Sequence, residues 1–132
     1  MINHHDVKTG QLSNGVLVIT NDSELAAILE HTLSPASIAY IVADTMLDAA
    51  KIVERGTNPA VILIDLSADQ ALEFVEQVKG HARFSQIPVL AVTEDPSLPE
   101  VKLALKAGAN RWITKSFVGH TLLAVMRQFA II

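Results

Sequence analysis

Short, unbroken runs of Val, Ile and Leu recur along the chain, and they alternate with segments whose apolar residues repeat at helical spacing. A strand with one solvent-exposed face alternates apolar and polar residues, whereas a strand covered on both faces is apolar throughout. Strands that alternate with helices form a parallel sheet, because each crossover returns the chain to the same end of the sheet. The pattern therefore predicts a doubly wound α/β fold. With five strands, the commonest order in such a sheet is 2-1-3-4-5.

The apolar runs and the residues that flank them give the expected element boundaries. The strands are expected at residues 16–20, 38–42, 60–66, 88–93 and 111–114. The helices are expected at about residues 25–33, 46–56, 71–80, 97–108 and 119–129. Ser97 and Glu100 have the spacing of a capping box at the start of the fourth helix. Residues 1–14 are polar and aperiodic, so we expect a tail there and one domain over residues 15–132.

The size and composition suit one small domain. A chain of 132 residues buries roughly two-thirds of its unfolded surface, which is enough for a core without disulfides, and the sequence contains no cysteine. No apolar run reaches membrane-spanning length and no secretory signal pattern begins the chain, so we expect a cytoplasmic protein. The formal net charge is -4 and the basic residues are scattered, which argues against direct binding to nucleic acid.

Three apolar runs each end in one reactive side chain: Asp65, Thr93 and Lys115. In a parallel sheet flanked by helices, the carboxyl ends of the strands share one rim, and ligands bind there. A carboxylate, a hydroxyl and an ammonium on one rim indicate phosphoryl chemistry on an aspartate, because the ammonium offsets the charge that the phosphoryl group brings. The switch point between the first and third strands would place Asn21 or Asp22 beside Asp65.

Four segments carry a resemblance to a known family: residues 59–66, 87–93, 107–112 and 113–117. In this order they resemble the CheY-like receiver domain of two-component response regulators, whose fold is the flavodoxin/CheY-like form of the doubly wound sheet. The resemblance implies that Asp65 is the phosphoacceptor and that Thr93 bonds the phosphoryl group after it arrives. It also implies that Lys115 neutralises that group and that Trp112 occupies the aromatic switch position.

The resemblance also implies a divalent cation, usually Mg²⁺, in the site. Mg²⁺ prefers oxygen ligands that include one or two carboxylates, so an acidic group is expected beside the acceptor. The family's acidic pair ends the first strand, where this chain has Thr20 and Asn21, and Asp22 is the acidic residue just beyond. The candidate ligands are Asp65, Asn21, Asp22 and Ser67. Because an amide carries no charge, we expect weak Mg²⁺ binding and slow phosphorylation.

Three further departures from the family pattern surround the predicted site. Asp69 and Gln70 lie in a short loop where receivers usually have a Pro-Gly turn, and Glu94 replaces a small residue after the threonine. Ser116 replaces a proline whose preceding peptide bond is commonly cis in the family. Since a cis bond before any other residue costs roughly 3 kcal/mol, we expect the loop after the lysine to be arranged differently.

Each candidate residue also has a purely structural explanation. Asp65 could be a turn or helix-cap residue, and Asp22 could simply cap the first helix. Thr93 and Lys115 could be an ordinary strand residue and a solvated lysine, and Trp112 could be a packed aromatic at the edge of the sheet. The spacing of the three rim residues relative to the strands favours the functional explanation.

Three hypotheses for the function remain from the sequence. The first is a receiver that takes a phosphoryl group from a sensor histidine kinase or phosphotransfer protein and then binds a downstream partner. Its docking face would consist of the fourth helix, the fifth strand and the fifth helix. Such a receiver has no enzymatic activity beyond self-phosphorylation and dephosphorylation at Asp65. Because the chain ends after the fifth helix, we expect a separate output partner, or one excised domain.

The second hypothesis is a phosphorylation-independent pseudo-receiver that serves as a protein-interaction module. Thr20, Asn21, Glu94 and Ser116 favour it, because each departs from the family pattern at the site. The third hypothesis is a flavodoxin-like nucleotide binder. It requires a phosphate-binding loop rich in Gly, Ser or Thr after the first strand, whereas residues 21–24 are acidic.

Overall fold

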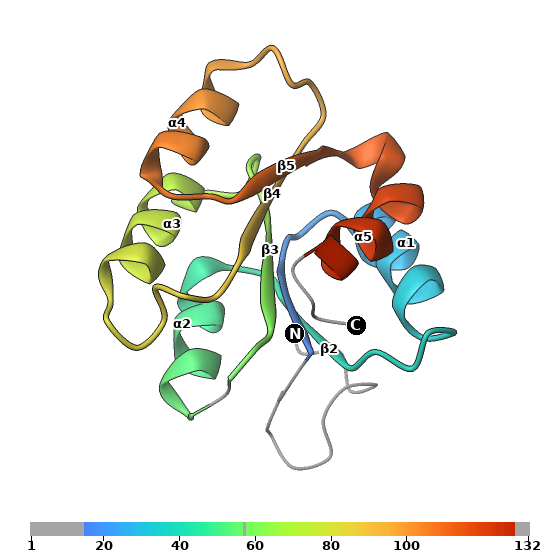
Figure 1. Ribbon diagram of the computed structural model, residues 1–132, viewed down its shortest axis with the longest axis horizontal. Coiled ribbons are helices and arrows are strands. Elements are labelled where there is room, and N and C mark those ends of the chain that lie inside the picture. Colours follow the sequence, from blue (N-terminus) through green and yellow to red (C-terminus); the bar gives the residue numbers. More distant parts are fainter. Residues whose placement is uncertain (1–14, 57, 129–132) are drawn as a thin grey trace.

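The computed structural model describes residues 15–56 and 58–128, and it contains one parallel sheet of five strands. The strands are β1 (Val16–Ile19), β2 (Tyr40–Ala43), β3 (Val61–Asp65), β4 (Val89–Thr93) and β5 (Arg111–Thr114). Their spatial order is β2-β1-β3-β4-β5, with β3 in the middle of the sheet and β2 and β5 at its edges (Figure 1). The predicted fold class and strand order are confirmed. The predicted tail at residues 1–14 and the last predicted helical residue, Phe129, lie outside the described residues.

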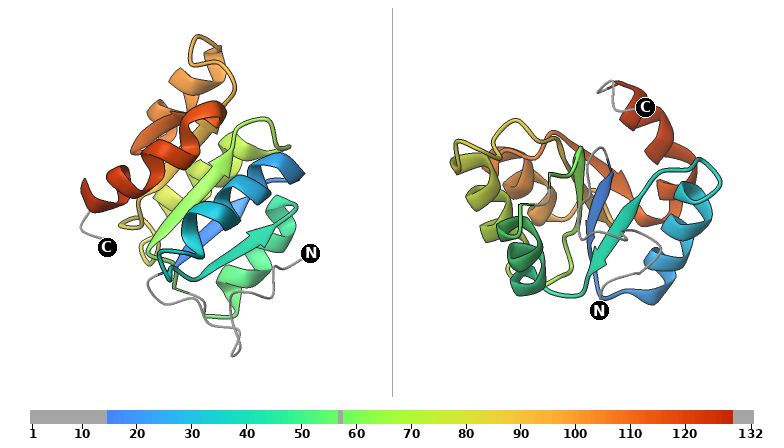
Figure 2. Two further views of the ribbon diagram at one scale, coloured as in Figure 1. Left: turned by 90° about the vertical axis from the view of Figure 1, so that its right-hand side faces the viewer. Right: turned by 90° about the horizontal axis from the view of Figure 1, so that it is seen from below.

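Helices cover both faces of the sheet. The helices α1 (Ser23–Leu33) and α5 (Val118–Gln128) lie on one face, and α2 (Met46–Glu54), α3 (Ala71–Gly80) and α4 (Pro99–Ala107) lie on the other (Figures 1 and 2). A short 3₁₀ turn, η1 (Lys115–Phe117), joins β5 to α5. The boundaries of β1 to β4 differ from the predicted ones by at most two residues, and β5 has the predicted boundaries. The chain is therefore wound on both sides of the sheet, as the unbroken apolar runs predicted.

Alternate residues of the central strands point to opposite faces of the sheet and pack in two separate apolar layers. Ile62 and Ile64 of β3 pack in the layer beneath α2, α3 and α4. Val61 and Leu63, which point the other way, pack in the layer beneath α1 and α5. Each of these four side chains is at most 1% exposed, and burying a side chain of this kind stabilises the fold by about 1.5–3 kcal/mol. The two layers hold the strands firmly and thereby fix the positions of the residues at their ends.

The predicted capping box at the start of α4 is wrong. The helix begins at Pro99, its N-cap is Leu98, and no side chain caps it. Ser97 instead donates its backbone N–H and its hydroxyl to the Asp95 carboxylate, at 2.9 Å and 2.7 Å. Proline at the first helical position already has a helical φ and no N–H that needs a partner, so it starts the helix two residues after Ser97.

Gly108 ends α4, and its substitution should weaken the fold. Its φ is 121°, and a Cβ built there would lie 2.6 Å from Cγ of Lys79. That lysine is held in place because its Nζ donates to the backbone oxygen of Ile87 at 2.7 Å. We expect Gly108→Ala to lower the free energy of unfolding by about 2–3 kcal/mol, through backbone strain and overpacking together.

Gly56 is the matched control for this substitution. Its φ is 88°, but nothing lies within 4 Å of an added Cβ. Gly56→Ala therefore carries only the left-handed strain, about 1 kcal/mol. Urea denaturation of the two variants measures the difference, and equal losses would show that Lys79 does not restrict the position of Gly108.

Candidate functional site

Asp65 lies at the carboxyl end of β3, at the rim that the sequence predicted. The register pairs Ile19 of β1 with Ile64 of β3, so the next residues, Thr20 and Asp65, lie side by side. On the other side, Asp65 pairs with Val92 of β4. Asp65 is 1% exposed and Thr20 is likewise 1% exposed. The sheet therefore holds a carboxylate and a hydroxyl together in a buried position.

Four donors surround the Asp65 carboxylate. Its Oδ1 accepts the backbone N–H of Ser67 at 2.9 Å and the Ser67 hydroxyl at 2.6 Å. Its Oδ2 accepts the Thr20 hydroxyl at 2.7 Å and lies 3.1 Å from Nζ of Lys115. A buried carboxylate is stable only when such partners replace its water. Ser67, Thr20 and Lys115 therefore keep the Asp65 carboxylate ionised and fix its orientation.

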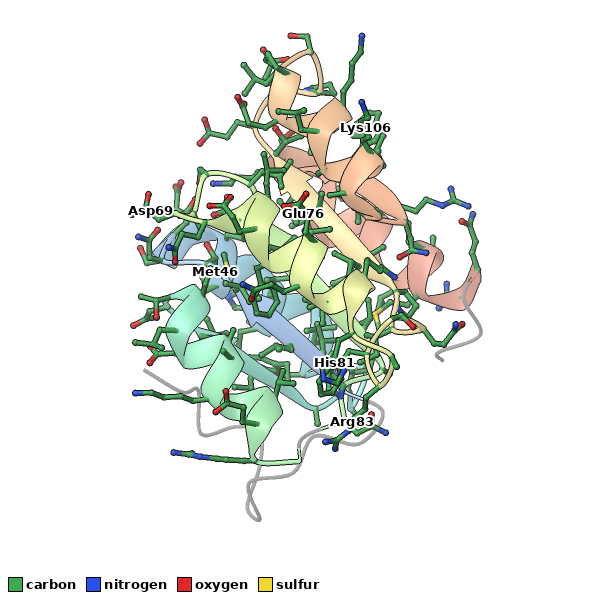
Figure 3. The ribbon with its side chains drawn as sticks, turned by 90° about the vertical axis from the view of Figure 1, so that its left-hand side faces the viewer. Met46, Asp69, Glu76, His81, Arg83 and Lys106 are labelled. Atoms are coloured by element: carbon green, nitrogen blue, oxygen red, sulfur yellow. The ribbon has the colours of Figure 1, made fainter. Side chains whose placement is uncertain are left out.

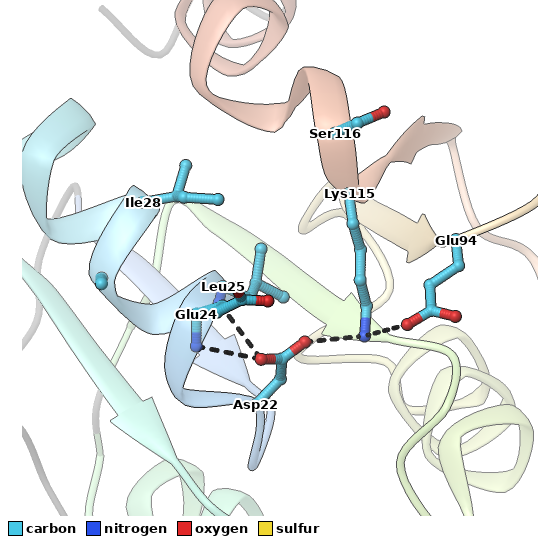
Figure 4. Close-up of a pocket in the computed structure, with 8 residues that line it drawn as sticks. Asp22, Glu24, Leu25, Ile28, Glu94, Lys115 and Ser116 are labelled. Carbon is cyan, nitrogen blue, oxygen red and sulfur yellow. Dashed lines mark hydrogen bonds and ion pairs between the residues drawn. The ribbon is translucent and has the colours of Figure 1, made fainter.

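Lys115 links Asp65 to two other carboxylates. Its Nζ lies 3.1 Å from Oδ2 of Asp22 and 3.8 Å from Oε1 of Glu94, and it also contacts the Ser67 hydroxyl at 3.4 Å. Figure 4 shows the lysine reaching down from η1 between Asp22 and Glu94, at one side of a cleft that Ile28 and Ser116 also line. The ammonium thus joins the loops after β1, β3 and β4.

The surroundings shift the pKa values of the three charged groups that meet here. Burial opposes ionisation of Asp65, but hydrogen bonds from Ser67, Thr20 and Lys115 outweigh it and hold the Asp65 pKa below its ordinary value. The hydrogen bond from Lys115 lowers the pKa of Asp22. Burial alone would lower the pKa of Lys115, but its bonds to Asp65 and Asp22 raise it overall. All three groups are therefore charged at neutral pH.

The lowered Asp65 pKa predicts a loss of stability in acid. A carboxylate with a folded-state pKa below its unfolded value of 3.8 stabilises the fold above that pH, and the contribution disappears as the pH falls through the folded-state pKa. Urea denaturation from neutral pH to below 3.8 should therefore show a steep fall for the native chain and a shallower one for Asp65→Asn. Parallel curves for the two chains would show that Asp65 has no lowered pKa.

The Thr93 hydroxyl lies at the predicted rim but faces its own loop. Its Oγ1 donates to the backbone oxygen of Asp95 at 3.1 Å and accepts the Asp95 N–H at 3.2 Å. The hydroxyl therefore does not bond Asp65 in this conformation. Trp112 lies on the edge strand β5 and is 43% exposed, so it is not the packed edge aromatic that was the alternative prediction.

The predicted metal ligands do not all share one place. Asp22 lines the cleft beside Lys115 and Glu94, whereas Asn21 lines a second cleft with Asp44 and Asp69. Figure 3 shows Asp69 and Met46 on the side of the molecule where α2 and α3 lie next to each other. Within residues 15–56 and 58–128, no group of three or more His, Cys, Asp or Glu side chains is arranged to hold a metal ion.

Two hydrogen bonds to Asp65 were not predicted from the sequence, whereas the changed loop after Lys115 was. Thr20 was considered only as a replaced acidic residue, and Ser67 only as a metal ligand, yet both donate directly to Asp65. The strand register would have revealed Thr20, because the residues that follow paired positions in parallel strands are neighbours. The peptide bond between Lys115 and Ser116 is trans, and η1 starts at the lysine, as expected for a differently arranged loop.

A comparison with protein families matches the response regulator receiver domain to residues 16–127. The chain belongs to the response regulator receiver domain family. It is therefore a receiver domain of two-component signal transduction rather than a nucleotide binder. Chemotaxis protein CheY1 of Helicobacter pylori is 28% identical over 110 residues, which cover 81% of this chain and 89% of that protein.

Two solved structures share the fold of this receiver domain. A response regulator from Chloroflexus aurantiacus has a TM-score of 0.79 and 21% identity, and the alignment covers 88% of this chain and 97% of that one. The receiver domain of the Pseudomonas aeruginosa sensor histidine kinase PA1611 holds a magnesium ion in its active-site cleft. Its TM-score is 0.77 at 16% identity, with 86% of this chain and 94% of that one covered. Among the described parts of our chain, no helix has the length and apolar character needed to cross a membrane.

Proposed function

We propose that this receiver domain accepts a phosphoryl group on Asp65 and then switches a protein-docking surface in the cytoplasm. The donor is a phosphohistidine of a sensor histidine kinase or of a phosphotransfer protein. One observation carries the proposal: a buried, ionised carboxylate ends β3 with an ammonium 3.1 Å away. An oxygen of Asp65 attacks the phosphorus, the donor's P–N bond breaks, and the imidazole leaves with the electron pair of that bond.

The groups around Asp65 suit the charge that arrives with the phosphoryl group. Lys115 supplies a positive charge, and the Thr20 hydroxyl and the Ser67 N–H supply donors that already point at the acceptor. Transfer of a phosphoryl group depends mainly on positioning and on such compensation. In this proposal the Thr93 hydroxyl exchanges its bonds with Asp95 for a bond to the phosphoryl group, which links the chemistry to the loop between β4 and α4.

The output surface of the proposal is the face formed by α4, β5 and α5. Several large apolar side chains on or next to α4 and β5 are exposed: Leu98 at 40%, Leu103 at 50%, Leu105 at 39% and Trp112 at 43%. Exposed apolar surface that exceeds single scattered residues is typical of protein-binding sites. The Thr93 loop leads directly into α4, so a change at Thr93 reaches this face through one connection.

Trp112 provides a readout for the proposed switch, because it is the only tryptophan of the chain. After a small acyl phosphate is added, we expect the tryptophan fluorescence of the native chain to change and that of Asp65→Asn to stay constant. Trp112 shares the edge strand with the docking face, so the change would report that face. An equal response of the two chains would contradict the link between Asp65 and the surface.

A second function, a phosphorylation-independent interaction module, is favoured by a specific observation. Both oxygens of Asp65 already have two partners each, and Lys115 is shared with Asp22 and Glu94. The predicted Mg²⁺ site, formed by Asp65, Asn21, Asp22 and Ser67, stays a prediction. A module of this kind would bind its partner equally well as the native chain and as Asp65→Asn.

A further inference from the structure

The Asp65 carboxylate has no unused acceptor position in this structure. A carboxylate offers roughly four lone-pair sites, and four donors approach Asp65: the N–H and hydroxyl of Ser67, the hydroxyl of Thr20 and the ammonium of Lys115. A metal ion that binds Asp65 must displace at least one of them. Thr20 is buried, so its hydroxyl would have little access to water to replace a lost bond, whereas Ser67 is exposed.

Both carboxylate oxygens of Asp22, the second acidic group of the site, likewise already accept hydrogen bonds. Its Oδ1 accepts the backbone N–H groups of Glu24 at 3.0 Å and Leu25 at 3.4 Å, and so caps α1. Its Oδ2 accepts from Lys115 at 3.1 Å. Figure 4 shows the carboxylate turned between the helix end and the lysine. A metal ion would have to compete with the helix cap or with the ammonium.

The remaining candidate ligands do not provide replacement charge. Thr20, next to Asp65, is a neutral hydroxyl that donates its proton to the carboxylate. Asn21 is neutral as well and lines a different cleft from Asp22. Mg²⁺ requires near-octahedral oxygen ligands at about 2.0–2.1 Å and gives up its water reluctantly. The residues of this site therefore do not fit Mg²⁺.

We infer that the ammonium of Lys115 is the resident cation of this site and that Mg²⁺ is not a component of it. Lys115 bridges Asp22 and Asp65 at 3.1 Å each, so one ammonium already offsets the charge of both carboxylates. Its side chain is 14% exposed, so most of it is shielded from water. The inference rests on the proposed function, because it names the charge that meets the phosphoryl group on Asp65.

Calorimetric titration of the full chain with Mg²⁺ alone tests this inference without any phosphodonor. We expect no saturable binding to the native chain. Lys115→Met removes the resident cation, and Asn21→Asp adds a carboxylate at an exposed position in the other cleft, so it controls for added negative charge. Lys115→Met should bind Mg²⁺ roughly 10-fold or more tightly than the native chain, the scale of change seen when groups around a metal site are altered.

Saturable Mg²⁺ binding to the native chain that Asp65→Asn removes would overturn the inference. Failure of Lys115→Met to gain Mg²⁺ binding would also overturn it, because Lys115 would then not occupy the place of a divalent ion. Circular dichroism of each variant confirms that it is folded, and Lys106→Met, which removes an exposed lysine of α4, is the control for a general change of charge.

A second measurement separates this inference from the proposed function. If the native chain forms a phosphoryl adduct, its rate of formation should be the same in Mg²⁺ and in a metal chelator. A rate that falls 10-fold or more in the chelator would overturn the inference while the proposed function stands. Absence of an adduct under both conditions would contradict the proposed function, and the Mg²⁺ titration would still decide the inference.

Discussion

Replacing Lys115 with methionine should lower the free energy of unfolding by about 3 kcal/mol at neutral pH, because it leaves a buried carboxylate without its cation. Asp65 has a fully buried side chain and lies 3.1 Å from Nζ of Lys115, and Asp22 lies at the same distance. Without the ammonium, the two carboxylates retain only neutral donors and repel each other. Urea denaturation of the native chain and of Lys115→Met at neutral pH measures the loss.

A double-mutant cycle shows whether this loss comes from the ion pair with Asp65. In the Asp65→Asn background, Lys115→Met should cost clearly less, because no buried charge is left behind. Lys106→Met provides the surface control, since that lysine is exposed on α4 and its removal should change stability by no more than about 0.5 kcal/mol. The ion-pair explanation would be wrong if Lys115→Met cost the same in both backgrounds.

Thr20→Val should lower the free energy of unfolding by about 2 kcal/mol, although valine has nearly the same shape as threonine. The Thr20 hydroxyl donates to Asp65 at 2.7 Å and accepts the backbone N–H of Asp22 at 3.0 Å. The substitution removes both bonds, and the oxygen of Asp65 that loses a donor is buried. We also expect the pH at which the fold loses stability to rise, since the Thr20 bond lowers the Asp65 pKa.

Thr32→Val is the matched control for this experiment. The Thr32 hydroxyl donates to the backbone oxygen of Ile28 at 2.8 Å within α1, in an exposed hydrogen bond that water can replace. The same change of atoms there should alter stability by no more than about 0.5 kcal/mol. Equal losses for the two valine variants would mean that the bond to Asp65 contributes nothing special to the fold.

The fold could be predicted from the sequence because its signals are local and repeated. Runs such as residues 61–64 are apolar at every position, which indicates a strand covered on both faces, and two apolar layers do enclose that strand. The start of α4 was predicted less well. Ser97 and Glu100 have capping-box spacing, but Pro99 between them starts the helix itself.

The positions of the site residues could also be predicted, but their bonds could not. Asp65 and Thr93 end β3 and β4, and Lys115 directly follows β5, so the topology alone brings them to one rim. Whether a hydroxyl faces the site or its own loop depends on a rotation about one side-chain bond. The Thr93 hydroxyl bonds Asp95, and no pattern in the sequence indicates that choice.

Asp22 both caps α1 and pairs with Lys115, and only the first of these two roles could be predicted from the sequence. A residue of this type before a helix is a common N-cap, and the structure confirms that Asp22 caps α1. Its second oxygen meets Lys115, which is far away in the sequence, so the pairing follows from the tertiary arrangement of β1 and β5. The backbone of Gln70 could not be predicted from the sequence either. Its φ of 63° is left-handed at the start of α3, and no glycine there indicates it.

The first experiment should measure the intact mass of the native chain after incubation with a small acyl phosphate in the presence of Mg²⁺. Asp65→Asn serves as the test variant and Asp69→Asn, at an exposed position of the neighbouring loop, as the control. We predict one phosphoryl adduct on the native chain and on Asp69→Asn, and none on Asp65→Asn. An unmodified native chain, or an adduct that survives in Asp65→Asn, would contradict the assignment of Asp65 as the phosphoacceptor.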